Sequence, residues 1–266
     1  VEKSTLPVKT AQTIKEILES SNINIKLNKK FHVLSNPEFL AEGTAINDLI
    51  DPDRVLIGGS NKEAINALSN IYSFWIDKSK IISTNLWSAE LSKLIANAFL
   101  AQRVSSINSV TAICEATGSS TKDVSLAVGK DKRIGKHFLN PGPGFGGSCF
   151  KKDILNLVYI CNHYGLHEVS EYWQQIININ DWQKRRITKL IINKLFGTIS
   201  EKSIAIFGFA FKANTNDTRE SPAISIALEL LNEGAFLRIY DPKVNYLQIE
   251  NDLGENNKKE KDQFKK

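Results

Sequence analysis

One cysteine of the chain lies directly after a cluster of glycines, in residues 144–149 (GFGGSC), and a Lys-Lys-Asp triplet follows it closely. Glycine lets the backbone adopt positive φ and approach a ligand. The apolar spacing from Ile154 onward predicts a helix that begins at Ser148 or Cys149. A helix N-terminus with cations beside it stabilises a thiolate, and Asp153 lies one turn later on the same face. The pattern favours a reactive thiol over a buried structural cysteine.

Two carboxylates, Glu38 and Glu42, follow a strand-like run at 32–34. Ligands of α/β folds gather at the carboxyl ends of strands. A helix that began at Pro37 would place both carboxylates on one face. Two interpretations stay open: a ligand-facing pair, and exposed acids in the first turn of a helix.

A second candidate pair, Lys93 and Asn97, is spaced by one turn within a long helical pattern, and solvent exposure is the alternative for both. His163 and His167 have the spacing of a helical metal-binding pair, but Gly165 separates them and no further ligand cluster accompanies them. We expect no metal site.

The fingerprint Gly-x-Gly-x-x-Gly is absent after the strand-like run 203–209, which holds one glycine. Asp241, at the end of the next strand, resembles a ribose-binding acid. Without the other glycines, a nucleotide-like ligand other than a dinucleotide is favoured here, with Lys212 as a phosphate or sugar contact. Arg133 fits either a surface residue or an anion contact.

Size and composition narrow the class of protein. The 266 residues suffice for two modest domains or one large one. The net charge of +5 is spread along the chain, which argues against a nucleic-acid partner. No apolar stretch is long enough to span a membrane. Three scattered cysteines are too few for a disulfide framework, so we expect a reducing compartment and a cytoplasmic protein.

The elements that must position these residues alternate along the chain. In the first third, the spacing predicts strands at 32–34, 54–57 and 80–82 and helices at 11–19 and 61–75, which is typical of a mainly parallel sheet. A helix from 87 to about 116 would extend about 45 Å, as helices that connect domains or form subunit interfaces do. Another helix is predicted at 168–195, and a βαβ unit at 203–209, 223–231 and 236–240.

The two ends predict a fragment. The chain opens without Met on residues typical of a strand end, and residues 251–266 are rich in Asn, Lys and Glu. We expect four parts, at 1–84, 85–200, 201–250 and 251–266, the last of them a disordered tail.

Together these segments resemble the family of UDP-glucose and GDP-mannose dehydrogenases. The matching stretches are 1–5 (VEKST), 36–43 (NPEFLAEG), 87–102, 144–153 (GFGGSCFKKD), 173–175 (WQQ), 208–212 (GFAFK) and 217–220 (DTRE). They cover the chain from Val1 to about Val244. Residues 87–108 are closer to the UDP-glucose branch than to the GDP-mannose branch.

The resemblance implies an α/β fold of two Rossmann-like domains, both incomplete here, joined by a long central helix. By this resemblance, residues 1–84 would be the remainder of an N-terminal NAD-binding domain, 85–200 a central helical dimerisation and substrate domain, and 201–250 the start of a C-terminal UDP-sugar-binding domain. It implies oxidation of UDP-glucose to UDP-glucuronate by two hydride transfers to NAD. Cys149 would capture the aldehyde as a thiohemiacetal, which loses the second hydride and leaves a thioester for water to hydrolyse. The alternatives are a GDP-mannose or UDP-N-acetylhexosamine dehydrogenase, and a non-catalytic assembly module.

The resemblance also implies roles for single residues. The catalytic set would be Cys149, Lys93 at the oxyanion, Asp153 at the water, Glu38 as acid and base, Asn97 and Thr5. Substrate contacts would be Phe39, Leu40, Ala41, Glu42, Lys93, Asn97, Arg133, Asn140, Phe145, Gly146, Phe211 and Lys212. NAD contacts would be Ser4, Thr5, Leu6, Glu42, Cys149, Lys152 and Arg219. Arg133 would reach a neighbouring subunit's site, so a homodimer or a larger homo-oligomer such as a hexamer is expected.

The sequence departs from the family at both ends. The N-terminal strand with the glycine fingerprint is missing, and the UDP-binding domain is expected to stop near Val244, where a lysine-rich tail follows. Residues 140–143 read Asn-Pro-Gly-Pro, without the lysine of some relatives. The fragment by itself is expected to be inactive.

Overall fold

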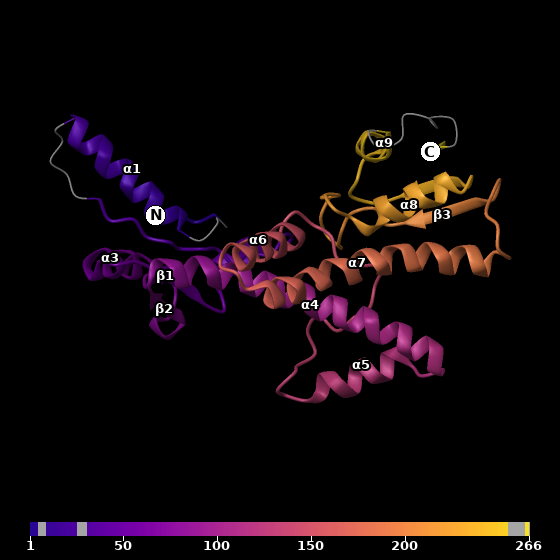
Figure 1. Ribbon diagram of the computed structural model, residues 1–266, viewed down its shortest axis with the longest axis horizontal. Coiled ribbons are helices and arrows are strands. Elements are labelled where there is room, and N and C mark those ends of the chain that lie inside the picture. The colour runs from indigo at the N-terminus through magenta and orange to yellow at the C-terminus, as the bar shows by residue number, and fades with distance from the viewer. Residues whose placement is uncertain (5–8, 26–30, 255–263, 266) are drawn as a thin grey trace. The chain divides into compact units, whose positions relative to one another are not determined.

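The computed structural model describes residues 1–4, 9–25, 31–254 and 264–265. It divides into two compact units, Val1–Ala96 and Asn97–Lys266, and the boundary falls within helix α4 (Leu86–Thr117). Each unit contains parallel strands and helices (Figure 1), so the predicted α/β class is confirmed. The predicted long helix is confirmed as α4.

The first unit is built around a short buried strand. Its elements are α1 (Thr10–Ile25), α2 (Ala45–Ile50), β1 (Val55–Gly58), α3 (Lys62–Tyr72), the 3-10 helix η1 (Lys78–Lys80) and β2 (Ile81–Thr84). All four residues of β1 are buried, and β1 pairs in parallel with β2. Strand β1 is apolar throughout, as is typical of a parallel strand that is covered on both faces. Leu34 and Tyr72 pack with it in the core of this unit.

Residues 32–34 form no strand, and the pairing predicted there consists only of two isolated β-bridges at Ser35. Ser35 pairs with Glu2 and with Gly58, and the amide of Asn36 donates to the carbonyl oxygen of Glu2 over 2.7 Å. Residues that follow these bridges, such as Ser4 and Asn36, therefore lie beyond the carboxyl end of a short pairing.

The predicted helix beginning at Pro37 is wrong, because helical structure starts only at Ala45. The Glu38 carboxylate accepts a hydrogen bond from the amide of Leu40 at 2.8 Å, and such local side-chain bonds compete with helix formation. Gly43 then adopts a φ of 87°. Glu38 and Glu42 consequently share no helix face.

The second unit contains the rest of α4, with α5 (Thr121–Lys130), α6 (Phe150–His163) and α7 (His167–Lys194). Helices α6 and α7 pack against each other (Figure 1). They bury Ile154, Leu157 and Cys161 of α6 and Trp173 of α7, residues that recur at helical spacing. The helix predicted at 168–195 is confirmed within one residue at each end.

The predicted βαβ unit is confirmed. It consists of β3 (Ser203–Phe207), α8 (Pro222–Asn232) and β4 (Phe236–Tyr240), and it continues into α9 (Tyr246–Gly254) and β5 (Phe264–Lys265). The three strands are parallel in the order β3-β4-β5. Helix α8 and the end of α7 cover one face of the sheet with a core that includes Phe209, Leu230 and Leu237.

The expected disordered tail from residue 251 is wrong at its start. Residues 251–254 complete α9, and Leu253 is buried because the apolar face of that helix packs on the core of the βαβ unit. Residues 264–265 add a strand beside β4. The rest of the predicted tail lies outside the described residues.

Asp241 ties together the loops that follow β3 and β4. Its Oδ2 accepts from the amides of Phe209 and Ala210 at 2.7 and 3.0 Å, and its Oδ1 from those of Lys243 and Val244 at 2.7 and 3.1 Å. Burial raises the pKa of Asp241, but the four amide donors outweigh it and hold the pKa below its usual value. These bonds give Asp241 a structural role in place of the predicted ribose contact.

We therefore predict that Asp241→Asn lowers the free energy of unfolding by about 2 kcal/mol near neutral pH. Because the folded-state pKa is lowered, the carboxylate's contribution is complete above the unfolded-state pKa and is lost as pH falls through the folded-state pKa. Urea unfolding at several pH values should show the gap between the two proteins close in acid. The exposed Asp53→Asn serves as the control; a gap that stays constant with pH would contradict the assignment.

Candidate functional site

Cys149 is exposed and occupies the N-cap position of α6. Its carbonyl oxygen accepts the first helical hydrogen bond, from the amide of Asp153 at 2.8 Å. The predicted helix start is confirmed. Of the two lysines that follow, Lys151 forms an ion pair with Glu220 at 3.0 Å, whereas Lys152 is exposed. The thiol is therefore presented to solvent at the positive end of a helix.

A buried polar pair lies one turn into α6. Asp153 is fully buried, and its Oδ2 accepts from Nδ2 of Asn97 at 2.6 Å. Asn97 is 7% exposed, and Lys93 on the same helix α4 is 6% exposed, so the solvent-exposed alternative for these two residues is wrong. A buried carboxylate held by an amide is a strong candidate for handling a proton or a water molecule.

The glycine-rich loop before Cys149 is held by amide side chains that the sequence analysis did not single out. Asn180 of α7 accepts from the amide of Phe145 at 2.8 Å and donates to its carbonyl oxygen at 3.1 Å. Asn108 of α4 accepts from the amide of Gly142 at 2.9 Å, and Gln183 of α7 donates to the carbonyl oxygen of Gly142 at 2.9 Å. All three amides are nearly inaccessible, at 0–3% exposure. Polar residues at core positions of a helical pattern are the signal that could have found them.

The loop also packs tightly against residues that follow β3. A Cβ on Gly146 would lie 2.6 Å from the carbonyl oxygen of Glu220 and 2.8 Å from Cβ of Phe211. A Cβ on Gly147 would meet the ring of Phe211 at 3.0 Å, and the amide of Gly147 donates to the carbonyl oxygen of Arg219 at 2.8 Å. The structure thus brings together three of the predicted substrate residues, Phe145, Gly146 and Phe211.

The first unit holds a second group of predicted residues. The ammonium of Lys93 lies 3.8 Å from Oε2 of Glu38 and 5.3 Å from the ring centroid of Phe39. The guanidinium of Arg54, which the sequence analysis did not consider, lies 3.9 Å from the same ring centroid. A buried ammonium paired with a carboxylate can stabilise an oxyanion or exchange a proton.

Among the described residues, the side chains of the remaining predicted residues take no part in these two groups of contacts, although the carbonyl oxygen of Arg219 accepts from Gly147 and the amide of Leu40 donates to Glu38. Arg133 is exposed and paired with Asp131 at 2.6 Å, and Arg219 is paired with Asp217 at 2.6 Å. Exposed residues among the others are Ser4, Leu40, Ala41, Glu42, Asn140 and Lys152, whereas Lys212 is half-buried. Thr5 and Leu6 lie outside the described residues.

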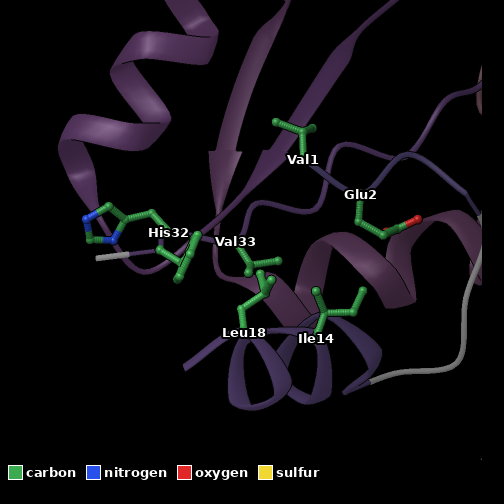
Figure 2. A pocket seen from close by; sticks show the side chains of 7 residues that line it. Val1, Glu2, Ile14, Leu18, His32 and Val33 are labelled. Atoms are coloured by element: carbon green, nitrogen blue, oxygen red, sulfur yellow. The ribbon is translucent and has the colours of Figure 1, made fainter. Parts of the chain in front are cut away.

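A hollow of about 360 Å³ lies between α1 and two segments that run up to the bridge of Glu2 with Ser35, residues 1–2 and 31–33 (Figure 2). Its lining is mainly apolar, with Ile14, Leu18 and Val33, and also includes Glu2 and His32. Burial raises the pKa of Glu2. None of the predicted site residues lines this hollow, so it is separate from the candidate site.

The described part of the chain contains no group of three or more His, Cys, Asp and Glu side chains that could hold a metal ion. No helix there has both the length and the apolarity that a membrane crossing requires.

Three family models match successive parts of the chain. The UDP-glucose/GDP-mannose dehydrogenase family, NAD binding domain, matches residues 1–76, its central domain matches residues 87–182, and its UDP binding domain matches residues 205–265. The expectation that the last domain stops near Val244 is therefore wrong, because both the match and the folded elements continue beyond it.

Individual proteins match over nearly the whole chain. UDP-glucose 6-dehydrogenase 3 of Arabidopsis thaliana is 59% identical over 257 residues, which are 95% of this chain and 53% of that protein. UDP-glucose 6-dehydrogenase of Caenorhabditis elegans is 58% identical with the same coverage. The chain spans about half the length of these curated relatives. The structure of a UDP-glucose dehydrogenase from Pyrobaculum islandicum matches with a TM-score of 0.86 at 32% identity, over 99% of this chain and 58% of that one.

The packing of the glycine loop predicts that substitution of two of its glycines, Gly146 and Gly142, changes the stability of the protein to different extents. Gly146→Ala should lower the free energy of unfolding by about 1–3 kcal/mol, because its Cβ would collide with the backbone at Glu220. Gly142→Ala is the matched control, since a Cβ there meets nothing within 4 Å. Chemical denaturation of both variants measures the difference. Equal stabilities would contradict the close packing of the loop.

Proposed function

Because the chain belongs to the UDP-glucose/GDP-mannose dehydrogenase family, we propose that the whole protein oxidises UDP-glucose to UDP-glucuronate, with NAD as the acceptor of two hydrides. The observation that carries this proposal is the 58–59% identity to proteins named UDP-glucose 6-dehydrogenase over 95% of the chain. The exposed thiol of Cys149 at a helix N-terminus supports it, since oxidation beyond the aldehyde requires a nucleophile.

The first unit offers residues that fit NAD. Ser4 is exposed and lies beyond the bridge of Glu2 with Ser35, and dinucleotides bind at such carboxyl ends of parallel strands. Glu42 is exposed too and follows the same strand end. We propose that these two residues, with Thr5, Leu6, Cys149, Lys152 and Arg219, hold the cofactor. When bound, NAD supplies the acceptor for the hydride in each oxidation.

The thiol has a defined task in this reaction. An aldehyde has no alkoxide from which hydride can leave, so the sulfur of Cys149 adds to its carbonyl carbon and the carbonyl oxygen takes the electron pair. Loss of hydride from this thiohemiacetal restores the C=O bond and gives a thioester. Water then adds to the thioester, the C–S bond breaks, and carboxylate and free thiol are formed.

The three cysteines are free, which is compatible with the proposed location of the protein in a reducing compartment such as the cytoplasm.

The charged and amide groups supply the other steps. Lys93 stabilises the oxyanion of the adduct. Glu38, whose Oε2 lies 3.8 Å from the ammonium of Lys93, takes and returns protons when the thioester forms and breaks down. Asp153, held by Asn97, positions or deprotonates the hydrolytic water.

Further residues hold the nucleotide sugar in this proposal. The packed group Phe145, Gly146 and Phe211 contributes apolar surface and backbone donors from the glycine loop. Phe39, Leu40, Ala41, Glu42, Asn140 and Lys212 complete the substrate contacts. Arg133 reaches the site of a neighbouring subunit, and exposed apolar side chains on α4, Trp87, Phe99 and Ile113, support self-association through that helix.

The whole protein should release about two NADH for each UDP-glucose consumed, because both oxidations use the same acceptor. Cys149→Ser should abolish net formation of UDP-glucuronate, since an alkoxide is formed far less readily than a thiolate. Absorbance of NADH and chromatography of the nucleotide sugars measure both outcomes. Cys161→Ala, a change at a buried cysteine outside the site, should keep the two-to-one ratio.

Other results would change the assignment. Full activity of Cys149→Ser would exclude the thioester route. Faster NADH formation with GDP-mannose or a UDP-N-acetylhexosamine than with UDP-glucose would assign that nucleotide sugar as the substrate. Absence of NAD binding by calorimetry in the whole protein would favour the non-catalytic assembly module.

A further inference from the structure

Arg54 lies directly before β1 and has an aromatic ring as its partner. Its guanidinium carbon is 3.9 Å from the ring centroid of Phe39. Within the described residues it has no ion pair or hydrogen bond through its side chain. Two acids nearby in the sequence are engaged elsewhere, Asp51 with Lys80 at 2.6 Å and Asp48 with the amide of Ala41 at 2.8 Å, and the exposed Asp53 forms no ion pair with Arg54. The contact with Phe39 therefore accounts for the position of this cation.

The segment 36–41, which carries Glu38 and Phe39, has no regular secondary structure and is held at its ends. At the start, Asn36 accepts from Nζ of Lys3 at 3.0 Å and from the hydroxyl of Tyr72 at 2.6 Å, and donates to the carbonyl oxygen of Leu56 at 2.8 Å. At the end, the amide of Ala41 donates to Asp48. In the middle of the segment, Glu38 accepts from the amide of Leu40 and pairs with Lys93, and the Phe39 ring is held by its contacts with cations.

The Phe39 ring contacts two cations of different character. Lys93 lies 5.3 Å from its centroid and belongs to the proposed catalytic set. Arg54 is closer, and its planar guanidinium can stack on a ring, whereas an ammonium acts as a point charge. The guanidinium, whose carbon lies 3.9 Å over the ring centroid, is the contact suited to holding the ring in one orientation.

We propose that Arg54 is a positioning residue for the nucleotide sugar: by stacking on Phe39 it holds the ring, and with it the middle of segment 36–41, in the orientation that binds the hexose. The proposal rests on the proposed function, because Phe39 is a substrate contact there. Arg54 itself needs no contact with substrate or NAD.

The test uses Arg54→Lys in the whole protein, which keeps the charge and removes the planar group. We expect the Kd and the KM for UDP-glucose to rise about fivefold, the effect of losing the contact between the guanidinium and the Phe39 ring. The KM for NAD and the thermal unfolding temperature should stay close to those of the wild type. Arg238→Lys, at an exposed arginine on β4, is the matched control and should change none of these values.

A double-mutant cycle with Phe39→Leu separates stacking from charge. If Arg54 acts through Phe39, Arg54→Lys should add no further loss to the Phe39→Leu protein. Additive losses, or an unchanged Kd in Arg54→Lys alone, would overturn the proposal. Calorimetric binding of UDP-glucose keeps this result independent of turnover. A wild type that binds UDP-glucose but forms no NADH would refute the proposed reaction, while the Kd values would still decide the role of Arg54.

Discussion

The second unit depends on hydrogen bonds that buried amide side chains make to the backbone of one glycine-rich loop. A loop with that many glycines has neither helix nor strand to satisfy its peptide groups, and an unpaired buried peptide group is costly. Asn180 resolves this for Phe145 by bonding both its N–H and its C=O, and Asn108 and Gln183 do the same for Gly142. The loop is thereby fixed without regular structure.

This arrangement explains why glycines are needed and where they are needed. Once the amides fix the backbone, Gly146 lies so close to the backbone of Glu220 that no side chain fits, and Gly147, with a φ of 82°, lies against the ring of Phe211. The tight contact ties the loop to the residues after β3, and the loop ends at Cys149 on the N-terminus of α6. The buried amides of Asn108 on α4 and of Asn180 and Gln183 on α7 therefore set the position of the thiol, together with the glycines that allow the loop to pack closely.

Sequence reasoning was most successful where one signal dominated. The apolar periodicity of α4, α7 and the βαβ unit predicted their bounds closely. It failed where a local side-chain bond or a tertiary contact decided the outcome. Glu38 bonds the amide of Leu40, which no periodicity reveals, and Leu253 extends α9 because it packs on a core formed by distant residues. Asn180 and Arg54 were missed for the same reason: their partners are far away in the chain or come from a loop.

The two loops that carry candidate residues solve the same problem by different physics. Neutral amides hold residues 142–147, and their strength depends little on ionic strength. Segment 36–41 relies on the Arg54–Phe39 stack and the pair of Lys93 with Glu38, which has a 36% exposed carboxylate. Partly exposed charge interactions weaken as salt screens them, whereas buried neutral hydrogen bonds do not. In the proposed reaction, segment 36–41 exchanges protons through Glu38 and therefore needs a group that can change charge, although salt weakens the interactions of such a group. The glycine loop would only present the thiol of Cys149, and side chains that never ionise can hold it.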